Sequence, residues 1–135
     1  MAARVILFDY FGVLAHGYGR VDTELVNFME KKLVGKCRLA VLSNMNGGTA
    51  DEMLGDYAEM FDEVFISGEL GFAKPDQRAF LLAASQMQEF PGDCLMIDDS
   101  EINCLSAKDA GMEAIQFKGV ADLEQKLEKY GIMTP

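Results

Sequence analysis

Five polar residues lie at or shortly after the ends of apolar runs of the chain, and their side chains suit phosphoryl transfer. Three are carboxylates, Asp9, Asp98 and Asp99, and the others are the hydroxyl of Ser43 and the ammonium group of Lys74. Crowded carboxylates repel one another unless a cation lies between them, and Mg²⁺ prefers oxygen ligands. A lysine can neutralise a phosphate oxygen, and a carboxylate can act as a covalent nucleophile that divides one hard step into two.

Each of these residues also has an ordinary structural explanation when it is taken alone. An aspartate or a Ser-Asn pair after a strand is common turn chemistry, and a lysine before a proline is commonly solvated. The functional interpretation rests on recurrence, because polar residues suited to one reaction follow four successive apolar runs. One shared site explains that recurrence better than separate accidents.

The apolar runs have the length and composition of buried strands. They separate longer amphipathic segments, and most are β-branched or continuously apolar, as strands covered on both faces are. Strands that alternate with helices pair in parallel through right-handed crossovers. The sequence therefore predicts an α/β fold, a three-layer Rossmann-like sandwich around a five-stranded parallel sheet. The expected strands are Val5–Phe8, Leu39–Leu42, Val64–Ile66, Cys94–Ile97 and Ala114–Phe117.

The amphipathic segments predict five helices. Asp22 and the pair Thr49 and Glu52 are suited to cap two of them, and Pro75 is suited to the first turn of a third. In such folds ligands bind beyond the carboxyl ends of the strands, which is where the five polar residues fall. The residues expected to face the core are Leu25, Met29 and Leu33; Met53, Tyr57 and Met60; Phe80, Ala83, Ala84 and Met87; Ile102 and Leu105; and Val120, Leu123, Leu127 and Tyr130.

Length, charge and cysteine content limit the classes of protein that fit. With 135 residues, 50% of them hydrophobic, the chain suits a single domain over residues 1–135. A net charge of −10 repels nucleic acid and anionic membrane surfaces, so we expect neither as a partner. Three cysteines without a CxxC spacing predict buried free thiols and a cytoplasmic location. The single histidine, His16, argues against a zinc site.

The segments around these residues resemble the motifs of the haloacid dehalogenase (HAD) superfamily, most of whose members are magnesium-dependent phosphatases. Four segments stand in the order typical of that superfamily: VILFDYFGVL, LAVLSN, GFAKPD and CLMIDDSEIN. The later segment AKDAGMEAIQF matches its usual ending, so the resemblance covers nearly the whole chain. Any one motif is weak, and the specificity comes from finding the four in order.

The resemblance implies a catalytic or substrate-binding role for five residues. Asp9 would be the nucleophile that forms an aspartyl-phosphate, and Lys74 would bridge this nucleophile and the phosphate. Ser43 and the backbone at Asn44 would hold the phosphoryl oxygens. Gly12 would permit the tight turn after the nucleophile.

The resemblance also implies a magnesium site. Its ligands would be the carboxylates of Asp9 and Asp99 and the backbone carbonyl of Phe11. Asp98, which an extended backbone turns to the opposite side from Asp99, would brace the loop behind the metal. Asn103 stands where many members have another acid, and it would act through hydrogen bonds to the residues behind the metal.

Phe11 is the first departure from the pattern. Phosphatases of this superfamily usually have an aspartate two residues after the nucleophile, which protonates the leaving group and then activates water. General acid–base help of this kind is worth about 10²–10⁴-fold, and phenylalanine cannot supply it. The dehalogenase branch typically has a tyrosine here, but it works without magnesium and lacks the paired acids that Asp98 and Asp99 provide.

The second departure is the lack of room for a cap domain. Only the short flap segment 15–21 separates the first motif from the next helix, and Met45–Ala73 is used up by a helix, a strand and a loop. We therefore expect an open site that excludes water poorly. It suits a phosphorylated small molecule, a phosphate presented by a protein partner, or a site covered by a second copy of the chain. His16 in the flap is a candidate substitute acid.

Three functions fit these observations. The first is a magnesium-dependent phosphohydrolase with weakened acid catalysis, acting on acyl or aryl phosphates, whose leaving groups depart without a proton. The second is a catalytically degenerate binding or regulatory module. The third is a haloacid dehalogenase-type hydrolase.

Overall fold

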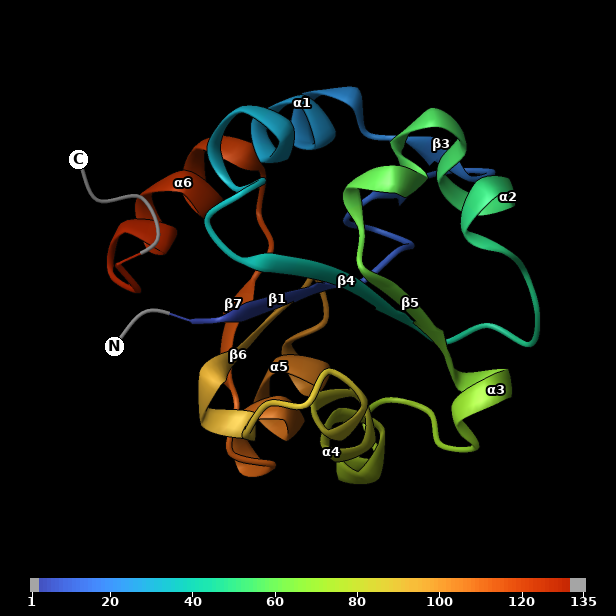
Figure 1. Ribbon diagram of the computed structural model, residues 1–135, viewed down its shortest axis with the longest axis vertical. Helices are drawn as coiled ribbons and strands as arrows, with labels where there is room; N and C mark the ends of the chain where they lie inside the picture. Colours follow the sequence, from blue (N-terminus) through green and yellow to red (C-terminus); the bar gives the residue numbers. More distant parts are fainter. Residues whose placement is uncertain (1–2, 132–135) are drawn as a thin grey trace.

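A five-stranded parallel sheet forms the centre of the molecule, and the computed structural model describes residues 3–131 (Figure 1). The strand order is β5-β4-β1-β6-β7, and all four neighbouring pairs are parallel. The first strand lies in the middle and is completely buried. The predicted α/β fold is thus confirmed. The strands are β1 (Val5–Phe8), β4 (Arg38–Ser43), β5 (Glu63–Ile66), β6 (Cys94–Asp98) and β7 (Glu113–Gln116).

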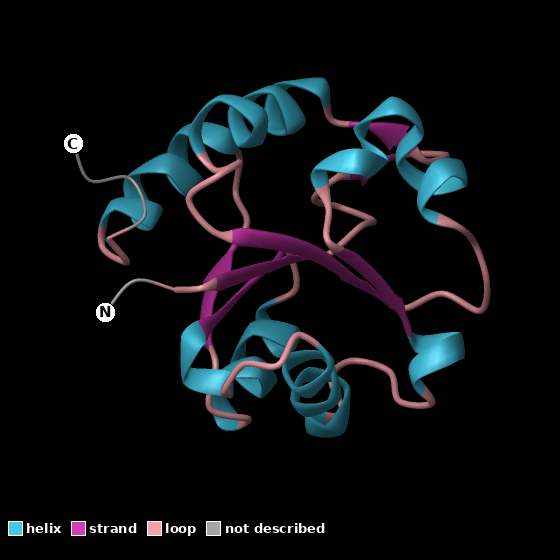
Figure 2. Ribbon diagram, in the orientation of Figure 1, coloured by secondary structure: helices cyan, strands magenta, loops and turns pink. Residues whose placement is uncertain are grey.

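Helices cover both faces of the sheet (Figure 2). One face carries α1 (Thr23–Lys32), α2 (Ala50–Leu54), the 3₁₀ helix η1 (Gly55–Met60) and α6 (Val120–Glu128). The other carries α3 (Ser67–Leu70), α4 (Gln77–Gln86) and α5 (Glu101–Asp109), and a 3₁₀ turn, η2 (Pro91–Asp93), leads into β6. Because side chains alternate along a strand, Ile6 and Phe8 join the first core layer, whereas Val5 and Leu7 join the second.

The segment after β1 forms a short hairpin rather than a domain. Strands β2 (Ala15–His16) and β3 (Arg20–Val21) pair antiparallel and lead directly into α1. Between β4 and β5 the chain forms only α2, η1 and their connecting loops. Within residues 3–131 no cap domain is therefore inserted at either position, as the spacing of the motifs predicted. None of the helices in this range combines the length and apolar character that a membrane crossing requires.

Two predicted helices differ from their expected form. Pro75 lies before α4 rather than in its first turn, because Asp76 is the N-cap and its carboxylate accepts a 2.9 Å hydrogen bond from the Arg78 N–H. The segment after Thr49 is α-helical only as far as Leu54. Gly55, with φ of 55°, ends that helix, and the chain continues as η1.

The buried face of α5 is not the predicted one. Ile102 and Leu105 are exposed, and Cys104 and Ala107 face the core instead. Both pairs have the same spacing of three residues, so periodicity alone does not distinguish them. Small side chains let α5 lie close to the sheet, where the Cys104 thiol is 3.4 Å from the Asp98 carbonyl oxygen. All three cysteines are free thiols; Cys94 and Cys104 are buried as predicted, and Cys37 is half-buried.

Truncation of core and surface residues tests this assignment of faces. We expect Phe80→Ala, in the core, to lower the free energy of unfolding by about 3–5 kcal/mol, because it leaves a cavity. Leu105→Ala should change it by less than about 1 kcal/mol, since the side chain is 54% exposed. Chemical denaturation measures both, and a large loss in Leu105→Ala would contradict the observed face of α5.

Candidate active site

A buried lysine joins two of the predicted carboxylates at the carboxyl edge of the sheet. Lys74 Nζ donates to Asp9 Oδ1 at 2.8 Å, to Asp98 Oδ2 at 2.8 Å and to the Leu42 carbonyl oxygen at 2.7 Å. An ammonium group has three N–H donors, so these three acceptors satisfy it fully. Because Lys74 is 4% exposed and Asp98 fully buried, losing either partner would leave an unpaired buried charge.

Three different strands bring these groups together. The Asp9 N–H donates to the Ile97 carbonyl at 2.9 Å, which ties the end of β1 to β6. Asp98 is the last residue of β6, and Leu42 is the penultimate residue of β4. The convergence predicted for the carboxyl ends of the strands is therefore present, with Lys74 reaching across from the loop before α4.

Asn44 holds the lysine loop through its side chain. Asn44 Oδ1 accepts from the Lys74 N–H at 2.9 Å, and Asn44 Nδ2 donates to the Lys74 carbonyl at 2.8 Å. The Asn44 amide thus binds both the N–H and the carbonyl group of the Lys74 backbone. Sequence reasoning gave Asn44 a role only through its backbone, because nothing in the sequence pairs residue 44 with residue 74.

Asp98 is braced on both carboxylate oxygens. Its Oδ1 accepts from the Ser100 N–H at 3.0 Å, and its Oδ2 accepts from Lys74 and from Asn103 Nδ2, the latter at 3.2 Å. Asn103 lies in the first turn of α5, whose N-cap is Ser100. A carboxylate with all these partners is fixed in place, so Asp98 suits a supporting role better than a mobile one.

The third carboxylate, Asp99, faces solvent and lies close to the other two. Ligand oxygens of Asp9, Asp98 and Asp99 lie within 4.8 Å of one another. This all-oxygen donor set fits a hard divalent cation such as Mg²⁺. Gly12, with φ of 89°, lies against the Asp99 carboxylate: a Cβ there would be 2.7 Å from Asp99 Cγ. Glycine suits the positive φ of this turn, and a side chain here would have to displace the Asp99 carboxylate.

Phe11 lies in the turn that follows the nucleophile position. The Gly12 N–H donates to the Ala15 carbonyl, and the Ala15 N–H donates to the Tyr10 carbonyl, at 2.8 and 2.9 Å. The Phe11 carbonyl takes no part in these bonds, which leaves it available to a cation. The Phe11 ring is 47% exposed.

Two further predicted residues have distinct surroundings. Ser43 ends β4 and is 1% exposed, and its hydroxyl has no hydrogen-bond partner within residues 3–131. A buried hydroxyl without a partner is costly, which suits a group that a ligand would satisfy. His16 Nε2 lies 2.8 Å from Asp22 Oδ2, so the imidazole is tied to the N-cap of α1 rather than to the carboxylate cluster.

Burial raises the pKa of Asp9 to about 6, against an ordinary value of 3.8. Loss of hydration is the main cause. Lys74 opposes it by stabilising the charged form, and Asp98 and Asp99 add to it by repulsion. Without a further positive charge, part of Asp9 is protonated near neutral pH.

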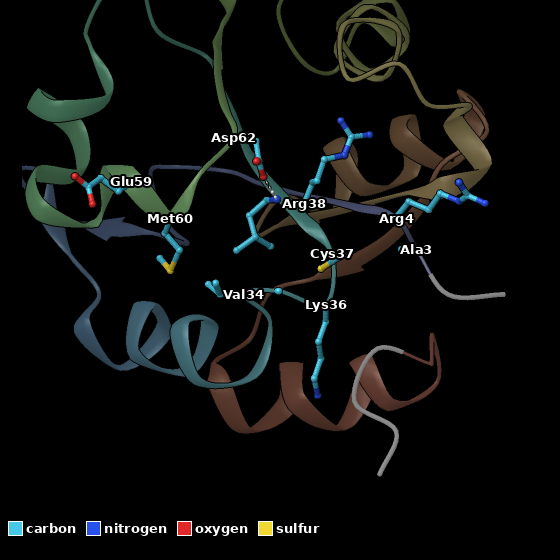
Figure 3. Close-up of a pocket in the computed structure, with 11 residues that line it drawn as sticks. Ala3, Arg4, Val34, Lys36, Cys37, Arg38, Glu59, Met60 and Asp62 are labelled. Atoms are coloured by element: carbon cyan, nitrogen blue, oxygen red, sulfur yellow. Dashed lines mark hydrogen bonds between the residues drawn. The ribbon is translucent and has the colours of Figure 1, made fainter.

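A hollow of about 840 Å³ lies elsewhere, at the amino-terminal edge of the sheet (Figure 3). It contains none of the predicted site residues, and its cations do not converge on it. The Arg38 guanidinium points away from Met60 and Val34 and instead bonds the Met87 carbonyl and Glu89. The residues predicted from the sequence lie instead at the opposite edge of the sheet, around Lys74.

The chain belongs to the haloacid dehalogenase-like hydrolase family, whose sequence profile matches residues 24–111. It is 28% identical over 120 residues to drimenol cyclase drtB of Aspergillus calidoustus, with 85% of this chain and 23% of that protein covered. The chain spans about a quarter of the length of the curated relatives it matches.

Two solved structures are similar over much of the chain. An uncharacterized protein from Corynebacterium glutamicum has a TM-score of 0.82 and 25% identity, with 99% of both chains covered. A HAD family enzyme from Bacteroides thetaiotaomicron, in complex with magnesium and inorganic phosphate, has a TM-score of 0.62 and 25% identity. That match covers 73% of this chain and 52% of the other.

Replacing Gly12 by alanine tests the oxygen cluster. We expect Gly12→Ala to abolish the rise in melting temperature caused by Mg²⁺, because the new Cβ displaces Asp99. Gly35→Ala is the matched control: Gly35 has a φ of 88° but open space around it. Both variants should lose about 1–2 kcal/mol of stability from backbone strain. Equal Mg²⁺ responses in the two variants would contradict the placement of the cation.

The raised pKa of Asp9 predicts that Mg²⁺ binding depends on pH. In the metal-free protein the protonated form is favoured by folding, so its stabilisation is complete below pH 3.8 and is lost as the pH rises through about 6. Mg²⁺ needs the ionised form and competes with the proton. Its apparent affinity should be about tenfold weaker at about pH 5 than at about pH 7.5.

Titration calorimetry at the two pH values measures this difference. Asp9→Asn should weaken binding and remove most of the pH dependence. An affinity that is the same at both pH values in the unaltered protein would show that Asp9 does not bind the ion.

Proposed function

We propose that the protein is a magnesium-dependent phosphohydrolase that acts through an aspartyl-phosphate at Asp9. The observation that carries the proposal is the cluster in which a buried Lys74 holds Asp9 beside Asp98 and Asp99. Further support comes from family membership and from the similarity to an enzyme that was solved with magnesium and inorganic phosphate.

The first step uses Asp9 as the nucleophile. Lys74 holds Asp9 Oδ1, which fixes the carboxylate and leaves Oδ2 without a hydrogen bond to any residue in the range 3–131. A carboxylate oxygen attacks phosphorus, the bond from phosphorus to the leaving oxygen breaks, and the leaving group departs as an anion with the electron pair. Water then attacks the aspartyl-phosphate, regenerates the Asp9 carboxylate and leaves its two hydrogen atoms on the released phosphate.

The neighbouring residues position these reactants. The unpartnered Ser43 hydroxyl and the N–H groups of the loop that follows it are the donors proposed for the phosphoryl oxygens. Asp9, Asp99 and the Phe11 carbonyl would hold Mg²⁺, which supplies positive charge to offset that of the phosphate and the carboxylates. Asp98 and Asn103 keep Lys74 and the start of α5 in place.

Phe11 limits the substrates of this reaction. Its side chain has no proton to give, so the leaving group must be stable as an anion. Acyl and aryl phosphates meet this requirement, whereas simple alkyl phosphates do not. Phe11 is also the observation that favours the second function, a binding module that has lost turnover.

Phosphate release from acetyl, aryl and alkyl phosphates tests the proposal. We expect Mg²⁺-dependent release from the first two, and loss of at least about 10³-fold in Asp9→Asn. Asp109→Asn removes an exposed carboxylate at the end of α5 and serves as the control that keeps activity. Phe11→Asp should raise the rate on an alkyl phosphate by about 10²–10⁴-fold, because it restores a general acid.

Three other results would each contradict the proposed function in a different way. Mg²⁺ binding without phosphate release, even in Phe11→Asp, would identify a binding module. Release of halide from a 2-haloacid without Mg²⁺ would identify a dehalogenase. Release that Asp9→Asn leaves intact would contradict the proposed nucleophile.

A further inference from the structure

We propose that Ser67 is a positioning residue: its hydroxyl holds the chain after β4 in the conformation that aims the Asn44 N–H at the bound phosphate. This inference rests on the proposed function, in which the Ser43 hydroxyl and the N–H groups after it bind the phosphoryl oxygens. Ser67 itself would touch neither the phosphate nor the cation. It would act through the backbone of Met45.

The Ser67 hydroxyl extends the pairing of two strands beyond their ends. Strands β4 and β5 pair in parallel as far as Ser43 and Ile66. Beyond that point, Ser67 Oγ accepts from the Met45 N–H at 3.0 Å and donates to the Met45 carbonyl at 3.1 Å. A hydroxyl can do both, because it has a donor hydrogen as well as acceptor lone pairs. The Gly68 N–H adds a bond of 2.8 Å to the same carbonyl, so the chain after β4 is held against the start of α3.

These bonds determine which way the Asn44 N–H points. In an extended chain the backbone groups of successive residues face opposite sides, so residues two apart face the same side. The Met45 N–H faces Ser67, whereas the Leu42 carbonyl faces the other side and accepts from Lys74 Nζ at 2.7 Å. The Asn44 N–H therefore faces the side of Lys74 Nζ, to which Asp9 is bonded. It donates to no residue in the range 3–131.

The same bonds decide which donors a phosphate can use. The Met45 N–H is occupied by Ser67, so it is not available to a ligand. The Ser43 hydroxyl, which is buried and unpartnered, and the Asn44 N–H remain. On the opposite flank the Asn44 side chain is bonded to the Lys74 backbone, so residue 44 is held from both directions. Donors fixed in advance need no reorganisation when charge arrives, which makes them effective.

Gly68 offers a second way to displace this loop. A Cβ at Gly68 would overlap the carbonyl group of Asn46, which is backbone and can yield only if the loop shifts. Gly68 does not have a positive φ, so an alanine there meets this close approach without backbone strain of its own. Gly68→Ala therefore moves the loop while it leaves the Ser67 hydroxyl in the chain.

Steady-state kinetics with para-nitrophenyl phosphate and Mg²⁺ test the inference in Ser67→Ala and in Gly68→Ala. We expect kcat/KM to fall at least about tenfold in both, because a small misplacement of a binding group is costly. The inhibition constant of inorganic phosphate should rise about three- to tenfold, the worth of one hydrogen bond. Titration calorimetry should show an unchanged affinity for Mg²⁺, because its proposed ligands follow β1 and β6. Ser67→Thr keeps the hydroxyl and should retain most of the activity.

Two control variants match these changes. Thr49→Ala also removes a hydroxyl that accepts from a backbone N–H, that of Glu52 at 3.2 Å, at the far end of the same connection. Gly92→Ala also adds a Cβ without a positive φ, but the nearest atom there is the Gly111 carbonyl oxygen at 4.0 Å. Both should keep the kcat/KM of the unaltered protein.

Other results separate the inference from the function on which it rests. An unchanged kcat/KM in Ser67→Ala or in Gly68→Ala would overturn the positioning role and leave the proposed function standing, and either variant decides the question if the other does not fold. An activity loss with an unchanged phosphate inhibition constant, or with an equal loss of Mg²⁺ affinity, would also overturn it, since the damage would then not be confined to the phosphate donors. No Mg²⁺-dependent hydrolysis by the unaltered protein would overturn the proposed function and this inference with it.

Discussion

The buried ammonium group of Lys74 is the interaction on which the site depends. Asp9 and Asp98 are two buried carboxylates, and burying a carboxylate without a partner of opposite charge is costly. One Nζ satisfies both and also the end of β4, through the Leu42 carbonyl. The lysine thus makes a local cluster of negative charge compatible with a stable fold. It offsets only part of the effect of burial and of the neighbouring carboxylates, since the pKa of Asp9 remains raised.

Negative charge remains at the carboxyl edge of the sheet after Lys74 is counted. The net charge of the chain is −10, and at this edge three carboxylates face one ammonium group. A divalent cation would supply the positive charge that Lys74 does not, and Gly12 leaves room for the Asp99 carboxylate that would bind it. Around this centre the protein provides little cover, because only the short hairpin of β2 and β3 follows the nucleophile turn.

Much of this arrangement could be predicted, because it follows from strand order and motif spacing. Residues at the carboxyl ends of parallel strands meet whatever the details of packing, so Asp9, Lys74 and Asp98 were found from the sequence. Contacts that depend on loop geometry were not. The two hydrogen bonds between the Asn44 side chain and the Lys74 backbone need two loops at the right separation. The prediction of which face of α5 is buried was also wrong, because Cys104 and Ala107 have the same spacing as Ile102 and Leu105.

Detection of a covalent phosphoryl group on Asp9 tests the central claim most directly. The protein is incubated with acetyl phosphate and Mg²⁺, quenched, and reduced with borohydride, which converts an aspartyl-phosphate to homoserine. The account predicts homoserine at residue 9, found by peptide mass spectrometry, and at no other aspartate. Phosphate release with an unmodified Asp9, or with homoserine at Asp98 or Asp99 instead, would contradict it.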